Sequence, residues 1–182
     1  DFITAGAAAI HIEDQVAPKR CGHVAGKQII ALEEMTGKLR AADRVRRDLD
    51  PDFVLIARCD ARGVTGGSVD ELIRRANAYI DAGADMIFPE ALTTLEDYKQ
   101  LCDAVKVPVL ANLTEFGKTP LFTTAQIASV GVSLALYPLT AFRTINKAAE
   151  LAYKSLLIDD NQQHLLASMQ TRDELYRYLH YH

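Results

Sequence analysis

Cysteine is scarce in this chain, and its spacing excludes one kind of structural framework. Only three of the 182 residues are cysteines, Cys21, Cys59 and Cys102, and no two of them form a Cys-x-x-Cys pair. An odd number of widely spaced thiols excludes a disulfide framework and argues against a zinc site. We therefore expect the protein to work in the reducing cytoplasm.

The chain also lacks the long uniform runs that mark membrane proteins and nucleic-acid binders. No apolar stretch has the length needed to span a bilayer, and no charged and apolar leader opens the sequence. No long basic run occurs and the net charge is −4, so we expect neither nucleic acid nor a membrane as partner. The hydrophobic content of 49% and the charged content of 24% are typical of one globular domain with a substantial core.

Short apolar runs alternate with segments of helical periodicity over the first 140 residues. The apolar runs cover residues 8–13, 53–60, 86–90, 107–113 and 133–139. The helical segments cover residues 27–49, 69–82, 94–104 and 123–130. Nearly continuous apolar strands that alternate with helices predict an α/β protein with a parallel sheet.

Polar residues at the ends of the predicted strands indicate which α/β architecture this is. Four strands end at or next to Glu13, Arg58, Glu90 and Asn112, and the fifth leads to Arg143. In a (β/α)8 TIM-type barrel, the carboxyl ends of all strands meet on the face that holds the active site. A doubly wound sheet usually has a G-x-G-x-x-G loop, and none is present. We therefore predict five strands, the fourth to the eighth, of a barrel whose first strands are absent from this sequence.

The pattern changes after residue 140. A long amphipathic helix is predicted over 141–158, a polar connection over 159–164, and a second helical stretch over about 171–179. No strand follows, and the tail is rich in tyrosine, which suits a half-buried interface. We divide the chain into a barrel part, 1–140, which includes a cysteine loop at 15–26, and a helical part, 141–182.

The cysteine loop contains the most reactive arrangement in the sequence, Lys19-Arg20-Cys21-Gly22-His23. Two cations before a thiol and an imidazole after it favour the thiolate and suit proton transfer near neutral pH. We expect Gly22 to give this loop its freedom to move. The alternative is a surface loop with an incidental cysteine.

The strand ends supply candidate groups for binding an acidic substrate. Arg58 ends a buried strand, where an unpaired charge is expensive, so it must pair with a substrate carboxylate or with Asp60 or Glu90. Glu13 and Asp14 could approach a hard divalent cation, or they could be solvated loop residues. Acceptors and neutral donors of the remaining ends, which could equally be turn residues, are Glu90, Asn112, Leu113 and Thr114. Arg143 and Arg172 fall on the terminal helices.

Together these residues resemble the isocitrate lyase and phosphoenolpyruvate mutase superfamily, and within it most closely the 2-methylisocitrate lyase family. The matching stretches are the pentad at 19–23 and residues 11–15, 88–91, 110–117, 119–122, 135–139, 141–143 and 169–172. They cover essentially the whole chain. Cys59 departs from the pattern, since a threonine is usual at that position.

The resemblance implies a retro-aldol cleavage of 2-methylisocitrate to pyruvate and succinate in propionate breakdown. Mg²⁺ (or Mn²⁺) would assist, and Cys21 would donate a proton, helped by Arg20 and His23. Glu13 would touch the metal through water, and the direct metal ligands and the base would lie on the absent first strands. Homo-oligomers with exchanged terminal helices, as dimers of swapped dimers, are implied. The substrate-binding residues implied are Cys21, Gly22, Arg58, Glu90, Asn112, Leu113, Thr114, Arg143 and Arg172.

Two alternatives remain open. Isocitrate could be the substrate in place of 2-methylisocitrate. The chain could also be an inactive truncated fragment that lacks the metal-binding strands, because it opens without methionine on what resembles the last turn of a helix.

Overall fold

The computed structural model describes residues 1–181, and the chain forms two compact units, Asp1–Pro138 and Leu139–His182. His182, the last residue of the predicted helical part, lies outside the described residues. The first unit holds the strands and the cysteine loop, and the second holds the terminal helices. Each unit is described by itself.

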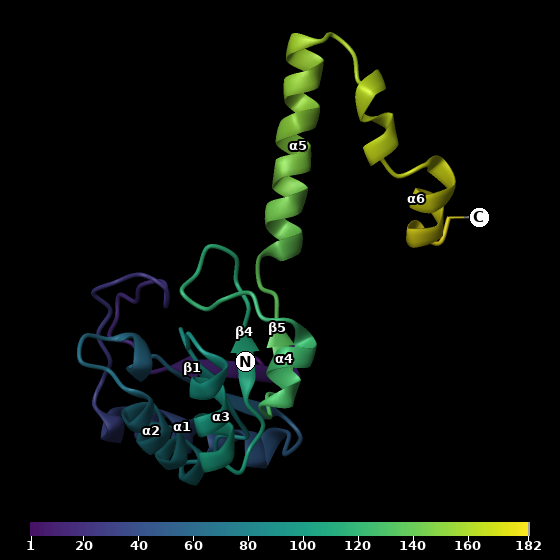
Figure 1. Cartoon of the computed structure of the whole chain (residues 1–182). Coiled ribbons are helices and arrows are strands. Elements are labelled where there is room, and N and C mark those ends of the chain that lie inside the picture. The colour runs from purple at the N-terminus through teal and green to yellow at the C-terminus, as the bar shows by residue number, and fades with distance from the viewer. Residues whose placement is uncertain (182) are drawn as a thin grey trace. The chain divides into compact units, whose positions relative to one another are not determined.

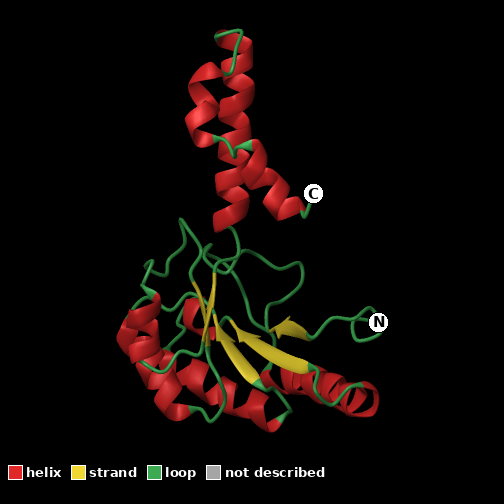
Figure 2. Ribbon diagram, turned by 90° about the vertical axis from the view of Figure 1, so that its right-hand side faces the viewer, coloured by secondary structure: helices red, strands yellow, loops and turns green. Residues whose placement is uncertain are grey.

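The first unit, residues 1–138, contains five parallel strands in a three-stranded and a two-stranded sheet (Figures 1 and 2). They are β1 (Ala9–Glu13), β2 (Val54–Cys59), β3 (Met86–Pro89), β4 (Leu110–Asn112) and β5 (Leu134–Leu136). Strands β1, β2 and β3 pair in this order, β4 pairs with β5, and a parallel bridge between Ile87 and Val109 joins the two groups. Parallel neighbours in chain order are the arrangement of a TIM-type barrel, so the partial barrel is confirmed.

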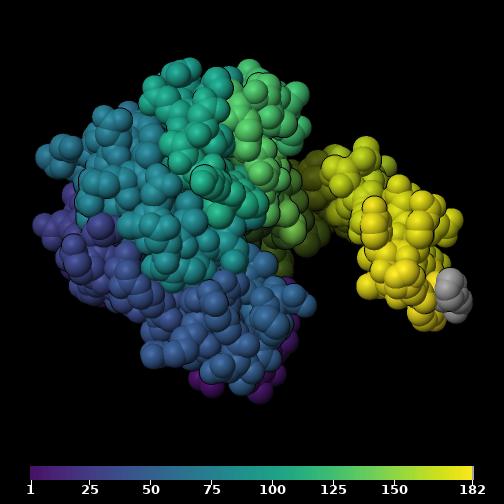
Figure 3. Space-filling model, turned by 90° about the horizontal axis from the view of Figure 1, so that it is seen from below, coloured from purple at the N-terminus to yellow at the C-terminus, as the bar shows by residue number. Residues whose placement is uncertain are grey.

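Helices follow the strands as the sequence predicts. They are α1 (Leu32–Leu49), α2 (Val69–Asp81), α3 (Leu95–Ala104) and α4 (Thr124–Ser129). The side chains of Ser68, Thr94 and Thr123 accept hydrogen bonds from backbone N–H groups three residues on, which fixes the starts of α2, α3 and α4. Seen from below in Figure 3, the blue and teal residues of this unit form a continuous surface.

The predicted start of the first helix at residue 27 is wrong. Residues 27–30 run back beside residues 14–16, where the Val16 N–H donates to the Gln28 carbonyl at 2.9 Å and the Ile30 N–H to the Asp14 carbonyl at 2.8 Å. These backbone groups pair across the base of the cysteine loop, so α1 begins only at Leu32.

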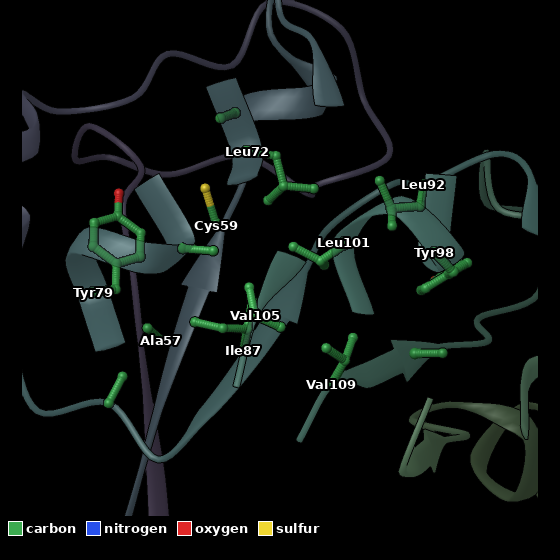
Figure 4. Close-up of a cluster of buried hydrophobic side chains, with 14 of the residues drawn as sticks. Ala57, Cys59, Leu72, Tyr79, Ile87, Leu92, Tyr98, Leu101, Val105 and Val109 are labelled. Atoms are coloured by element: carbon green, nitrogen blue, oxygen red, sulfur yellow. The ribbon is translucent and has the colours of Figure 1, made fainter. Parts of the chain in front are cut away.

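Alternation along the strands divides the sheet into two faces. Leu55, Ala57 and Cys59 of β2 have no exposed surface and pack toward the helices. Figure 4 shows the resulting core, in which Ile87 of β3 and Val109, which precedes β4, meet side chains of the helices, among them Leu72, Tyr79 and Leu101. Arg58 lies between Ala57 and Cys59, so its side chain leaves the strand on the other face.

The second unit consists of helices only, within residues 139–181. They are α5 (Thr140–Ile158), a 3-10 helix, η2 (Gln163–Ser168), and α6 (Arg172–Leu179). A capping box between Thr171 and Glu174 starts α6. Among the described residues, no helix is both long enough and apolar enough to cross a membrane.

Candidate active site

Arg58 gathers the carboxylates that stand at the carboxyl ends of the strands. Its Nε lies 3.2 Å from Oε2 of Glu13 on β1 and 2.9 Å from Oδ2 of Asp60. Its Nη2 lies 3.0 Å from Oε2 of Glu90, which follows β3. Asn112, the last residue of β4, donates to the same Glu90 oxygen at 3.4 Å. Both protein partners expected for Arg58, Asp60 and Glu90, are therefore present.

The cysteine loop is tied to this cluster by side chains at its base. The Gln15 amide accepts from the Arg20 N–H and donates to the Arg20 carbonyl, both at 2.9 Å, and it donates to Asp60 at 3.2 Å. Lys19 pairs with Glu13 at 3.1 Å. The loop therefore leaves β1, turns over the strand ends and exposes the Cys21 thiol to solvent.

Gly22 is buried, and it packs directly against the cluster. A Cβ at this position would lie 2.2 Å from Cγ of Glu90 and 2.6 Å from Nη2 of Arg58. The missing side chain allows the backbone to approach two charged groups. The freedom of movement expected from Gly22 stays a prediction.

His23 joins the cysteine loop to a second loop, residues 113–123, which rises from the same end of the unit (Figure 1). Its Nδ1 accepts the Lys118 N–H at 3.0 Å, and its Nε2 lies 3.1 Å from Oε1 of Glu90. Burial lowers the pKa of the imidazole below its usual range; the Glu90 carboxylate opposes this shift, and the positive charges of Lys27 and Arg58 support it. An acceptor role for Nδ1 fits a neutral ring with its proton on Nε2.

Asp14 lies on the opposite face from Glu13, so the two do not form a joint cation site as the sequence suggested. The Asp14 carboxylate is fully buried and accepts from the Asp60 N–H at 2.8 Å, the Tyr79 hydroxyl at 2.7 Å and the Cys59 thiol at 3.2 Å. Burial raises its pKa, although these hydrogen bonds oppose the shift. The group is structural, and Cys59 packs in the core as expected.

The remaining predicted site residues either follow β4 or belong to the second unit. Leu113 and Thr114 follow β4 and are buried, and the Leu113 N–H donates to the Leu136 carbonyl at 2.9 Å. Arg143 on α5 and Arg172 at the start of α6 belong to the second unit, so their roles at the cluster stay predictions.

The sequence analysis missed one residue of the cluster, Lys27. Its fully buried ammonium lies 2.7 Å from Oδ1 of Asp60 and donates to the Gly22 carbonyl at 2.7 Å. Asp60, considered only as a possible partner of Arg58, has no exposed surface and holds both cations. Because the helical pattern is predicted to begin at residue 27, no local feature of the sequence marks Lys27 as lying ahead of the helix.

The described residues do not fit a complete magnesium site. Within residues 1–181, no three His, Cys, Asp or Glu side chains form a group that could hold a metal ion. Glu13 could contribute a carboxylate, but its Oε2 lies close to both Lys19 and Arg58. A metal would need further ligands.

A protein-family model described as phosphoenolpyruvate phosphomutase matches residues 1–157. That range contains the strands, the cysteine loop and the whole charged cluster. The chain belongs to this family.

Several of its relatives are lyases. The 2-methylisocitrate lyases of Escherichia coli and Vibrio cholerae are each 54% identical to it, over 181 and 184 residues. These matches cover 100% and 98% of this chain but only 60% and 58% of the two relatives. The chain thus spans about three fifths of the length of these relatives.

Solved structures agree with the fold. A crystal structure of 2,3-dimethylmalate lyase, of the PEP mutase/isocitrate lyase superfamily, superposes with a TM-score of 0.85 at 35% identity, over 97% of this chain and 57% of that chain. A phosphonopyruvate hydrolase in complex with oxalate and Mg²⁺ superposes with a TM-score of 0.79 at 29% identity, over 98% of this chain and 61% of that chain.

We predict that His23 titrates below the usual histidine pKa of about 6.5. Because the folded-state pKa is the lower one, the stability gained from neutral His23 is complete above pH ~6.5 and is lost as the pH falls through that value toward the folded-state pKa. NMR titration of the imidazole measures this, with His23→Gln for assignment and His164→Gln as the control. A His23 pKa at or above the usual value would contradict the prediction.

We predict that Gly22→Ala displaces the cysteine loop, because its new Cβ would overlap Glu90 and Arg58. Limited trypsin digestion with mass spectrometry should show faster cleavage after Lys19 and Arg20. Gly37→Ala is the matched control, since its added Cβ would lie more than 4 Å from every atom outside its chain neighbours and the adjacent helix backbone, and it should stabilise α1 by ~0.5–1 kcal/mol. Cleavage of Gly22→Ala at the unmodified rate would refute the close-packing role.

Proposed function

We propose that the protein is a carbon–carbon lyase that cleaves 2-methylisocitrate to pyruvate and succinate, in the methylcitrate cycle of propionate breakdown. The observation that carries this is identity of 54% to 2-methylisocitrate lyases along the whole chain, the Cys21 loop included. The packing of that loop on a cluster of strand-end side chains supports it.

The proposed reaction is a retro-aldol cleavage. A base removes the substrate hydroxyl proton, the adjacent carbon–carbon bond breaks, and its electron pair remains on the succinate half. Cys21 then donates its thiol proton to that carbanion, which leaves a thiolate and completes succinate. Bound Mg²⁺ would stabilise oxygens of the emerging 2-oxo acid. No step is assigned to the metal. The base then releases the hydroxyl proton and the thiolate regains one, which restores the starting state with no net change in protons.

The strand ends offer specific groups for the substrate. The contacts of Arg58 with Glu13, Asp60 and Glu90 are made by Nε and Nη2, so Nη1 would meet a substrate carboxylate. The Asn112 amide nitrogen points to Glu90, which fixes its orientation. Its Oδ1 is buried with no hydrogen-bond partner among the described residues, and an unsatisfied acceptor of this kind would receive a substrate hydroxyl.

We also propose that the second unit mediates homo-oligomerisation, with terminal helices exchanged between copies. Many of its large apolar side chains are exposed, and such surface is typical of an interface. They include Phe142, Ile145, Tyr153, Leu157, Ile158, Leu166, Tyr178 and Leu179. A reducing compartment such as the cytoplasm is proposed because Cys21, Cys59 and Cys102 are all free thiols.

We predict that Cys21→Ser lowers the cleavage rate by at least ~10³-fold, since a hydroxyl is a far weaker acid than a thiol, while substrate still binds. Pyruvate release coupled to lactate dehydrogenase measures the rate, and calorimetry measures binding. Cys102→Ser, at a cysteine outside the cluster, is the control. Full turnover by Cys21→Ser would end the proton-donor role, and preference of the wild-type protein for isocitrate would overturn the proposed substrate.

We predict that the chain is a dimer or larger at micromolar concentration and that Leu157→Asp shifts it toward the monomer. Leu157 is 85% exposed on α5, so the change cannot act by disrupting a core within the unit. Light scattering after gel filtration measures the mass, with Lys147→Asp on the same helix as the control. A monomeric wild-type chain, or equal masses for both variants, would refute the interface.

A further inference from the structure

Among the lysines that form ion pairs within residues 1–181, Lys27 alone has a completely buried side chain. Its Nζ makes two short contacts, one with Oδ1 of Asp60 and one with the carbonyl oxygen of Gly22, each at 2.7 Å. The ammonium therefore connects the cysteine loop to Asp60, which follows the end of β2. Burying such a charge is costly unless it is paired and hydrogen-bonded, and here both conditions are met.

The anion that receives Lys27 is itself held in place. The Asp60 N–H donates to Asp14 at 2.8 Å, and its carboxylate accepts from Arg58 at 2.9 Å. Burial alone would raise the pKa of Asp60, but the hydrogen bond from Arg58 and the charges of Arg58 and Lys27 hold it below its usual range. The loop is thus anchored to a rigid, ionised group.

The space around Lys27 is shaped for its ammonium. Gly63, in the 3-10 helix η1 (Ala61–Gly63), lies so close that an added Cβ would stand 2.4 Å from Nζ and 2.6 Å from Cε of Lys27. Even a methyl group at this position would push the ammonium away from Asp60 or from Gly22. The glycine is needed for the contact and not for a turn, because its φ is not positive.

We infer that Lys27 is a positioning residue that holds the cysteine loop against the strand ends. Lys27 fixes the Gly22 carbonyl, while the Cα of Gly22 lies against Glu90 and Arg58. Cys21 precedes this fixed residue and His23 follows it, so the clamp sets the positions of both. The effect of Lys27 on catalysis rests on the proposed lyase function. The effect of Lys27 on the placement of the loop does not rest on that function.

The test is Lys27→Met, which keeps most of the side-chain volume and removes the ammonium. Hydrogen exchange measured by mass spectrometry should show amides of residues 20–25 exchanging at least tenfold faster, while β2 and β3 keep wild-type protection. Lys99→Met, at an exposed lysine paired with Asp103, is the matched control. Loop exchange within twofold of wild type would overturn the inference.

A second variant guards against misfolding. Gly63→Ala leaves Lys27 and every charge in place, and it should speed loop exchange at least threefold by displacing Nζ. If Lys27→Met loses protection throughout β2 and β3, Gly63→Ala decides: faster exchange confined to the loop supports the clamp, and unchanged exchange overturns it.

Kinetic measurements distinguish a role of Lys27 in positioning the proton donor from a purely structural role. A mispositioned acid should lower kcat about 10- to 100-fold and change KM less than threefold, because Arg58 and Asn112 remain. Equal kcat in Lys27→Met and wild type would overturn the catalytic part. If the wild-type chain cleaves no 2-methylisocitrate, the proposed function fails, and the exchange comparison still decides whether Lys27 holds the loop.

Discussion

The carboxylate of Asp60 is the interaction on which the site depends. It has no exposed surface, and it binds three side chains. Arg58 lies on β2, Gln15 lies at the start of the cysteine loop, and Lys27 directly follows the end of that loop. An anion buried so completely is tolerated only with such partners, and removing one of them would leave a charge uncompensated. The same requirement therefore fixes the strand end and both ends of the loop.

The alternation of side chains along β1 and β2 keeps this charged cluster apart from the core. Glu13 and Arg58 face the site, whereas Asp14 and Cys59, one residue further on, face the helices and meet Tyr79. Asp14 still serves the site, because it binds the backbone N–H of Asp60. A buried carboxylate with three hydrogen bonds thus positions an ionised one that lies at the base of the loop.

Most of the fold could be predicted from the sequence, because apolar runs and helical periodicity are local signals. All five strands lie within the predicted runs, and β1 begins one residue inside its run while β4 begins three residues inside. What the sequence could not show depends on contacts between distant residues. Lys27 and Asp60 are 33 residues apart, and a lysine ahead of a helix resembles any solvated charge until Asp60 is placed beside it. The close packing of Gly22 likewise depends on Glu90, which is far away in the sequence, so local reasoning could not predict it.

Residues on both sides of Cys21 contact groups at the strand ends or at the base of the loop. Lys19 pairs with Glu13 at the end of β1, the Arg20 backbone is held by Gln15, and His23 faces Glu90 and Lys118. The Lys19 side chain, the Arg20 backbone and the His23 ring therefore fasten the loop to the strand ends. The efficiency of a proton transfer from Cys21 then depends on where the loop holds its sulfur. Placement of a reacting group to within about 1 Å can change a rate by a factor of ~10². A loop clamped on both sides of Gly22 meets that demand while leaving the thiol open to a substrate.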